Sequence, residues 1–335
     1  MATLMEEDEM RRGLWELVGV AGLFLANGAC ESAVTGNEGN FLFSYPADDR
    51  VFDFNKPIAV GAFLDMEVKD AGDRSDIELS SAKTEDTSVL TVESTDGNSV
   101  TLKAVGEGET SLTVEGTTQG GEAQSDSVNL LARVPEVHTL RHTCGATEAE
   151  AAYLTGQQIY IAYEFEMSDG QPVIGYGYYP VTPSIASMVV DESFKGSQFI
   201  RFDLSGTGTG TLDSDLTSSS LGVRIVGETD LDGVEEPVSF TGEDIGVGST
   251  KLFYVRPTTA GMPVCQALTP VVVHSDTPSI CTVTLQEGLA GDLDAGGKEH
   301  GWFALKGLTT GNCLYTVEFP HGTAATAQFS QQVQP

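Results

Sequence analysis

The chain has 335 residues, of which 40% are hydrophobic, and a formal net charge of −32 at pH 7. This length is sufficient for several buried cores, whereas so negative a charge would repel a phosphate backbone and excludes a nucleic-acid partner. Only 20% of the residues are charged, and the abundance of Gly, Ser and Thr favours strands joined by tight turns over helices.

Residues 1–29 are predicted to be an export signal. Arg11 and Arg12 precede an apolar run from Leu17 to Ala26, and this run is too short for a bilayer, which requires about 20 helical residues. The acidic stretch ahead of Met10 is unlike the basic start of a signal peptide, so translation is expected to begin at Met10.

The end of this signal resembles the lipobox of bacterial lipoproteins, with the sequence ANGAC at Ala26–Cys30. The resemblance implies that Cys30 is lipidated and anchors the protein to a membrane. Asn27 departs from the pattern, because leucine is usual there, and Glu16 interrupts the apolar region. Ordinary signal cleavage and a cytoplasmic N-terminal helix are the alternatives. Residues 30–45 are expected to form a flexible tether, because they begin with small and polar residues.

Three copies of one pattern follow. The sequence SVLTV at Ser88–Val92 recurs as SIASM at Ser184–Met188 and as SICTV at Ser279–Val283, at offsets of 96 and 95 residues. A period near 95 is too long for a solenoid and is typical of a β-sandwich domain. The predicted fold is therefore all-β, with three tandem immunoglobulin-like β-sandwich domains. Their expected ranges are 46–135, 136–228 and 229–335.

The first copy shows the strand pattern most clearly. Apolar residues alternate with others along Ile58–Met66, and Asp96-Gly97 indicates a hairpin, because both residues tolerate positive φ. The stretch VTLKAVGEGETSLTVEG at Val100–Gly116 returns as ALKGLTTGNCLYTVEF at Ala304–Phe319. The longer spacing of this pair places a 12-residue insertion within Leu285–Gly301 of the third copy. The first copy is expected to form six or seven short antiparallel strands.

This pattern, from SVLTV through VTLKAVGEGETSLTVEG to SDSVNLLA, resembles the bacterial immunoglobulin-like group 2 domain of intimin- and invasin-type surface proteins. The first copy matches best and the second least, and the tryptophan often found on the third strand is absent. The resemblance implies an adhesive or spacer module without an active site of its own.

Two motifs of the second copy are expected to be structural. His138, His142 and Cys144 would share one face of a strand, but the two histidines would lie about 13 Å apart, too far to share one zinc ion. They are expected to be exposed on a first strand. The glycines of GTGTG at Gly206–Gly210 resemble a phosphate loop, but no Lys-Ser/Thr or helix follows, which favours a strand, a turn and a strand.

Two acidic loops are candidate calcium sites. Asp230 and Asp232 lie where the second copy passes into the third, and Asp292 and Asp294 lie in the insertion. Calcium prefers several carboxylate oxygens on a flexible loop, although neither loop has the full EF-hand spacing. Solvated acidic turns are the alternative, and no other cofactor is expected.

Of the five cysteines, four remain if Cys30 carries lipid. They can pair in three ways and would be oxidised in an exported chain. Strand parity turns Cys281 and Cys313 toward one core, which favours a bond between them and leaves Cys144 with Cys265 by elimination.

The sequence predicts a non-enzymatic, lipid-anchored bacterial envelope protein at the outer membrane or cell surface. Its immunoglobulin-like domains would serve as an adhesin, a stalk or a structural component, with an unknown surface protein or glycan as partner. No common hydrolase, metalloprotease or redox motif occurs in it. The alternative is a carbohydrate-binding accessory protein, in which Tyr176, Tyr178 and Tyr179 form an exposed platform. Exposed tyrosines would favour that alternative, and buried ones would favour the stalk.

Overall fold

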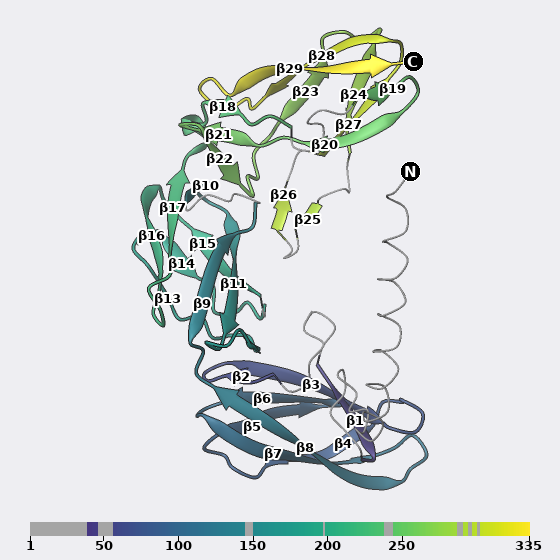
Figure 1. Ribbon diagram of the computed structural model, residues 1–335, viewed down its shortest axis with the longest axis vertical. Coiled ribbons are helices and arrows are strands. Elements are labelled where there is room, and N and C mark those ends of the chain that lie inside the picture. Colours follow the sequence, from purple (N-terminus) through teal and green to yellow (C-terminus); the bar gives the residue numbers. More distant parts are fainter. Residues whose placement is uncertain are drawn as a thin grey trace, which may run out of the picture.

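The computed structural model describes residues 39–45, 56–144, 150–196, 198–237, 244–286, 291–293, 297–299 and 302–335 (Figure 1). The predicted signal, Cys30 and most of the tether lie outside these residues. Within the described ranges the chain consists of strands and one short 3-10 helix, Glu228–Asp230, which confirms the all-β fold class. No helix in those ranges has the length and apolarity needed to cross a membrane.

The first sandwich is built from two four-stranded sheets, ordered β1-β3-β6-β5 and β2-β8-β7-β4. Its strands are β1 (Phe41–Ser44), β2 (Ile58–Ala59), β3 (Phe63–Asp70), β4 (Glu78–Thr84), β5 (Leu90–Asp96), β6 (Ser99–Ala104), β7 (Gly108–Thr117) and β8 (Ala123–Arg133). The expected hairpin at Gly97 is confirmed between β5 and β6, and Gly97 has a φ of 57°.

Two expectations for the first sandwich were wrong. Its described residues form eight strands, and β2 pairs with β8 in parallel. The tether was predicted to extend through residue 45, yet β1 pairs with β3, and Phe41 and Phe43 are fully buried. The alternation of Phe41, Leu42 and Phe43 is too short to stand out in a polar segment, and the strand forms because β3 offers it an edge.

The second sandwich contains β9 to β17. Its strands are β9 (Val137–His142), β10 (Glu150–Leu154), β11 (Gln158–Glu166), β12 (Pro172–Val173), β13 (Val181–Pro183), β14 (Met188–Val190), β15 (Phe199–Leu204), β16 (Gly208–Ser214) and β17 (Ser220–Val226). One sheet has the order β12-β11-β15-β14, with β9 also on β11, and β13, β16, β17 and β10 belong to the other. Gly206 lies in the turn between β15 and β16, and Gly208 and Gly210 lie in β16, so the expected order of strand, turn and strand is confirmed.

The third sandwich contains β18 to β29. Its strands are β18 (Gly233–Val234), β19 (Ile245–Gly246), β20 (Thr250–Tyr254), β21 (Pro257–Thr259), β22 (Met262–Cys265), β23 (Val272–Ser275), β24 (Cys281–Leu285), β25 (Gly291–Leu293), β26 (Gly297–Glu299), β27 (Trp302–Gly307), β28 (Gly311–Glu318) and β29 (Thr326–Gln334). Its sheets are β20-β27-β24 and β19-β29-β28-β23, while β18, β21 and β22 continue a sheet of the second sandwich. The expected insertion contains the hairpin of β25 and β26.

The repeated stretch encodes one tight turn, used twice. Gly108 and Gly311 begin β7 and β28 with φ of 151° and 150°, which side chains rarely adopt. A Cβ atom on Gly108 would lie 2.7 Å from Val89, and one on Gly311 would lie 3.0 Å from Ile280. The two glycines therefore allow a close approach to the same apolar residue of the repeat.

The three sandwiches follow one another along the molecule (Figure 1), but their cores exchange residues. Ile174 lies in the core of the first sandwich, and Ala59 lies in the core of the second. Cys265 belongs to the second core, and Leu154 belongs to the third. Neighbouring sandwiches are thus packed into each other rather than joined by a bare linker.

Gly108→Ala should lower the free energy of unfolding by about 1–3 kcal/mol, because it adds backbone strain to a clash with Val89. Gly120→Ala is the matched control, since its nearest neighbour, Thr118 Oγ1, would be 3.7 Å from the added Cβ. Urea unfolding measures both variants. Equal effects would contradict the role given to Gly108.

Candidate functional site

Some of the predicted site residues, among them Cys144, Cys265 and Tyr176, lie at two joints between the sandwiches. The first joint is the contact of residues 57–65 with residues 174–179. The second joint is the contact of residues 142–160 with residues 235 and 256–268.

The first joint is a short stretch of strand pairing. The Ala59 N–H donates to the Ile174 carbonyl at 2.9 Å, and the Ile174 N–H donates to the Pro57 carbonyl at 2.9 Å. Phe63 and Tyr176 exchange two further backbone hydrogen bonds, of 2.8 and 2.9 Å. A segment of the second sandwich therefore acts as an additional strand at the edge of the first.

Of the three tyrosines of the carbohydrate alternative, Tyr176 is bonded across this joint. Tyr176 is only 8% exposed, its hydroxyl donates to Asp65 Oδ1 at 2.9 Å, and its ring stacks on Phe63. Burial raises the pKa of Tyr176. Tyr178 and Tyr179 are half-buried, and the Tyr179 hydroxyl donates to the Phe194 carbonyl at 2.7 Å. The expected exposed platform was wrong for Tyr176, because the first sandwich covers it.

The second joint depends on one strand that serves two cores. β10 pairs in parallel with β17 of its own sandwich and with β22 of the third. Successive side chains of a strand point to opposite faces. Ala151 and Tyr153 accordingly pack in the second core, while Ala152 and Leu154 pack in the third, and all four are at most 3% exposed.

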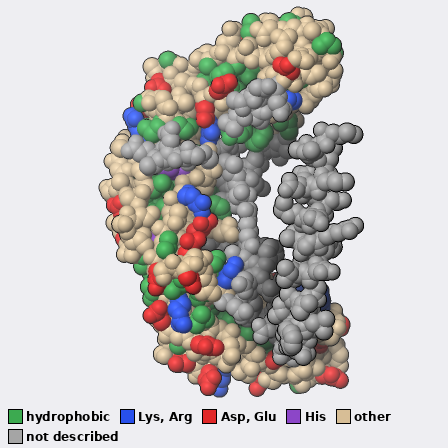
Figure 2. All heavy atoms as spheres, in the orientation of Figure 1, with side chains coloured by type: hydrophobic (Ala, Val, Ile, Leu, Met, Phe, Trp, Pro, Cys, Tyr) green, Lys and Arg blue, Asp and Glu red, His purple; other side chains and the backbone are tan. Residues whose placement is uncertain are grey.

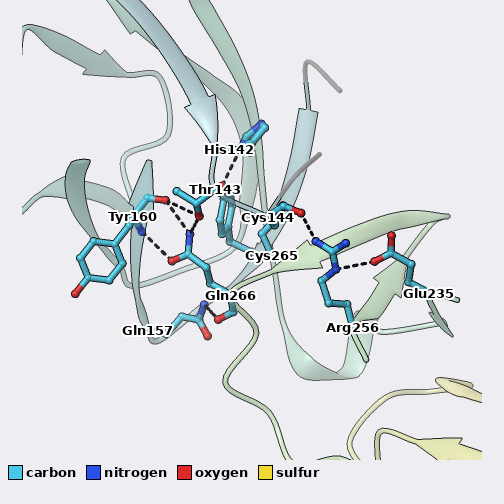
Figure 3. The surroundings of a disulfide bond; sticks show 10 residues. His142, Thr143, Cys144, Gln157, Tyr160, Glu235, Arg256, Cys265 and Gln266 are labelled. Atoms are coloured by element: carbon cyan, nitrogen blue, oxygen red, sulfur yellow. Dashed lines mark hydrogen bonds and ion pairs between the residues drawn. A yellow bond between two sulfur atoms is a disulfide. The ribbon is translucent and has the colours of Figure 1, made fainter. Parts of the chain in front are cut away.

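A disulfide crosses the same joint (Figure 3). Cys144 is bonded to Cys265 across 121 residues, with their Cα atoms 5.4 Å apart. Cys281 is bonded to Cys313 within the third core, where both are fully buried. These are the two pairs that strand parity and elimination favoured.

Gln266 links the third sandwich to β11 in the way a strand would (Figure 3). Its side chain is buried, its Oε1 accepts the Tyr160 N–H at 2.9 Å, and its Nε2 donates to the Tyr160 carbonyl at 2.8 Å. The Gln157 amide in turn donates to the Gln266 carbonyl at 2.9 Å and accepts the Leu268 N–H at 3.1 Å. Side-chain amides thus satisfy backbone groups where the ladder of β9 and β11 has ended.

Arg256 connects the Cys144 end of the disulfide to the third sandwich. Its guanidinium donates to the Cys144 carbonyl and forms an ion pair with Glu235, with Nε and Oε2 2.6 Å apart. Arg256 is only 7% exposed, so its charge requires these partners. Nothing in the sequence pattern pointed to Arg256 or Gln266, because their partners Cys144 and Tyr160 are distant along the chain.

The histidines of β9 are buried, and their predicted exposure was wrong. His138 is 2% exposed and His142 is 6% exposed. His138 Nδ1 lies 2.8 Å from the Ser214 hydroxyl, and His142 Nδ1 lies 2.7 Å from the Tyr153 hydroxyl. Burial lowers the pKa of both imidazoles to about 4. They share one face, as expected, but that face points into the core.

The two carboxylates of the acidic loop at residues 230–232 accept hydrogen bonds from backbone N–H groups. Asp230 Oδ2 accepts the Gly227 N–H at 2.8 Å, and Asp232 Oδ2 accepts the Ala260 N–H at 2.8 Å. Among the described residues, no group of three or more His, Cys, Asp or Glu is placed to hold a metal ion. The side chain of Asp292 and all of Asp294 lie outside that part of the chain, so calcium there stays a prediction.

Acidification should destabilise the second sandwich. Between pH 6.5 and about 4, His138 and His142 are neutral when folded and protonated when unfolded. The unfolded state then binds more protons, so the free energy of unfolding falls as the pH falls, by up to about 3 kcal/mol for each histidine. Urea unfolding across this range measures the effect.

The double variant His138→Gln, His142→Gln should show a flatter pH dependence in this window. His274→Gln is the control, because the His274 side chain is 55% exposed. An unchanged dependence in the double variant would assign the effect to other groups.

Gln266→Glu should weaken the second joint, because a carboxylate cannot donate to the Tyr160 carbonyl. The expected loss is about 2–3 kcal/mol in the free energy of unfolding, with a wider spread of interatomic distances by small-angle X-ray scattering. Gln119→Glu introduces the same charge at an exposed turn and serves as control. Identical behaviour of the two variants would show that the amide does not hold the joint.

No family model matches the chain, and no curated protein matches it either. Among solved structures it is similar to the Escherichia coli adhesin FdeC, at 16% identity and a TM-score of 0.25, over 84% of this chain and 95% of that one. It is also similar to domains 4–9 of the surface layer protein SbsC, at 14% identity and a TM-score of 0.27, over 88% of this chain and 45% of that one.

A third such structure is invasin, a bacterial integrin-binding protein, at 13% identity and a TM-score of 0.23. That match covers 88% of this chain and 60% of invasin. TM-scores this low say nothing about the function of this chain, which has to be argued from its own geometry.

Proposed function

We propose that the protein is a non-enzymatic component of the bacterial cell surface that displays its immunoglobulin-like sandwiches as a stiff stalk or adhesin. The observation that carries the proposal is the position of β10, which belongs to two cores at once. The anchor is a lipid on Cys30, and the loops at the sandwich ends supply contacts to a surface protein or glycan.

Stiffness follows from the way the joints are made. Domains linked by a small interface move relative to one another by default. Here a bend at the first joint would break the backbone bonds of Ile174 and Tyr176, and a bend at the second would separate β10 from β22. The bond between Cys144 and Cys265 adds a covalent limit to the second joint.

Two further features support an exported protein. Disulfides persist in oxidising compartments, and this chain has two that lie in its cores. Acidic side chains are spread over all three sandwiches on the face shown in Figure 2 rather than gathered in one patch. A surface of this kind stays soluble at high local density, because neighbouring copies repel one another.

The location can be tested in a bacterial host that expresses the full chain with an epitope after Pro335. The epitope should be reached by antibody on intact cells, and the protein should sediment with membranes. Cys30→Ser should release it into soluble fractions, since acyl chains supply about 0.8 kcal/mol per buried methylene. Ala29→Ser is the control for altered signal processing. Unchanged membrane partition of Cys30→Ser would contradict the lipid anchor, and an epitope shielded on intact cells would contradict surface display.

A further inference from the structure

The third sandwich has a sheet edge with the same backbone geometry as the edge of the first sandwich that takes part in the first joint. The same three backbone hydrogen bonds shape both edges, with lengths of 2.8–3.1 Å. In the first sandwich they run from Val60 to Arg133, from Gly61 to Ala104 and from Ala104 to Ala62; in the third they run from Val247 to Gln334, from Gly248 to Gly307 and from Gly307 to Ser249. Residues 57–63 therefore correspond to residues 244–250.

The second sandwich has this edge as well. Thr155 donates to Val226, Gly156 to Leu204, and Leu204 to Gln157, at 2.8–3.0 Å. In all three sandwiches the edge strand pairs in parallel with the last strand, as β2 with β8, β10 with β17 and β19 with β29. The residue that points from it into the core is almost fully buried each time, as Ile58, Tyr153 and Ile245.

In the first two sandwiches, an extended segment of the sandwich that follows pairs with this edge, and we call such a segment an arm. The arms are residues 170–176 and 261–267, which begin GQPVI and GMPVC. Each starts at a glycine of positive φ, 86° at Gly170 and 77° at Gly261. Ile174 then forms a parallel bridge with Ile58, and Cys265 pairs in the same sense with Tyr153. One joint geometry is thus used twice.

Within the described residues, no arm fills the corresponding edge of the third sandwich. By correspondence with Pro57, Ala59 and Phe63, its outward groups are the Asp244 carbonyl, the Gly246 N–H, and both backbone groups of Thr250. Thr250 lies opposite Lys306 in the antiparallel ladder of β20 and β27, but the Gly307 N–H donates to the Ser249 carbonyl, so the ladder's hydrogen bonds belong to the neighbouring pairs and both Thr250 groups point outward. The backbone bonds between turns and loops of the described residues include none from these outward groups. β19 is the last strand of its sheet, and Asp244 and Thr250 are exposed.

This edge also lacks the β-bulges that protect two edges of the first sandwich. The edge strands β4 and β5 each carry a register shift, between Leu79 and Ser81 and between Val92 and Ser94. Such bulges discourage pairing with another strand. The pairing of β19 with β29 has no register shift, and Gly246 leaves the backbone uncovered.

We propose that residues 244–250 accept the strand-donating arm of a further immunoglobulin-like sandwich. The arm is extended, follows a glycine turn and a proline, and presents an aliphatic residue to Ile245. Its backbone would pair with Asp244, Gly246 and Thr250 as Ile174 and Tyr176 pair with the first sandwich. Strand addition of this kind draws affinity from main-chain bonds and specificity from alternate side chains.

A second copy of this chain has no arm to offer. In its first sandwich the corresponding segment follows Arg74, where φ is 61°, but Ile77 is buried in the sandwich's own core and β4 pairs with β7. The arms of the second and third sandwiches are already engaged in the two joints. The arm therefore belongs to a sandwich other than the three described, and the inference holds wherever in the cell the protein resides.

The test uses the full chain and a synthetic peptide of residues 168–180, SDGQPVIGYGYYP, as the arm. Calorimetry should show saturable binding, and hydrogen exchange should slow at the amides of Gly246 and Thr250. The same peptide with Ile174→Asp should not bind, because the carboxylate would be placed against Ile245.

Gly246→Pro removes the outward N–H while leaving the ladder of β19 and β29 intact, and proline is tolerated on edge strands. Binding should weaken about tenfold, which combines a lost hydrogen bond with steric exclusion of the arm, while the unfolding midpoint stays unchanged. Thr250→Pro removes a second outward donor and serves if the first variant does not fold.

Three results would overturn the proposal. One is no saturable binding up to about 1 mM peptide, where a single added strand should already register. Another is equal binding by Gly246→Pro and the unsubstituted chain. The third is slowed exchange at Ala59 and Phe63 rather than at Gly246, since the peptide would then be replacing the chain's own arm at the first joint.

Discussion

The structure depends on the need of an edge strand for a partner. A sheet that ends in open water leaves a row of unpaired N–H and C=O groups, and this chain meets that need at β2 and β10 by bringing in the unit that follows. The result is a packed joint, because an arm that pairs with an edge also carries side chains into the core beneath it. Ile174 and Cys265 are buried in this way. Cohesion within each sandwich and cohesion between sandwiches thus have the same physical origin.

Much of the fold could be predicted from the sequence, because its strands and turns depend on residues that are close together along the chain. Period-two alternation indicated the strands of the first sandwich, Gly97 indicated its hairpin, and strand parity brought Cys281 toward Cys313. A glycine that must adopt positive φ leaves the same trace in the first and third copies of the repeat. For that reason Gly108 and Gly311 could be aligned from sequence and have nearly identical backbone angles.

The joints could not be predicted from the sequence, because the residues that contact each other there lie far apart along the chain. Ile174 has the pattern of a core residue, and nothing in its surroundings indicates that the core belongs to a neighbour. Gln266 and Tyr160 are separated by 106 residues, and Arg256 and Cys144 by 112. Parity correctly gave His138 and His142 one face, but histidine occurs on both exposed and buried faces. Their burial was set by Ser214 and Tyr153, which only the folded chain brings within reach.

The bond between Cys144 and Cys265 has a mechanical meaning for a protein held at one end. A pull along the chain would pass from Cys144 to Cys265 through sulfur, so the 121-residue span between them would carry none of the tension. At about 3.5 Å per residue, that keeps roughly 400 Å of chain from ever being drawn out. The Cys281 to Cys313 bond shields a further span of 32 residues. Most of the second sandwich and part of the third would keep their shape under a load that unravels the first.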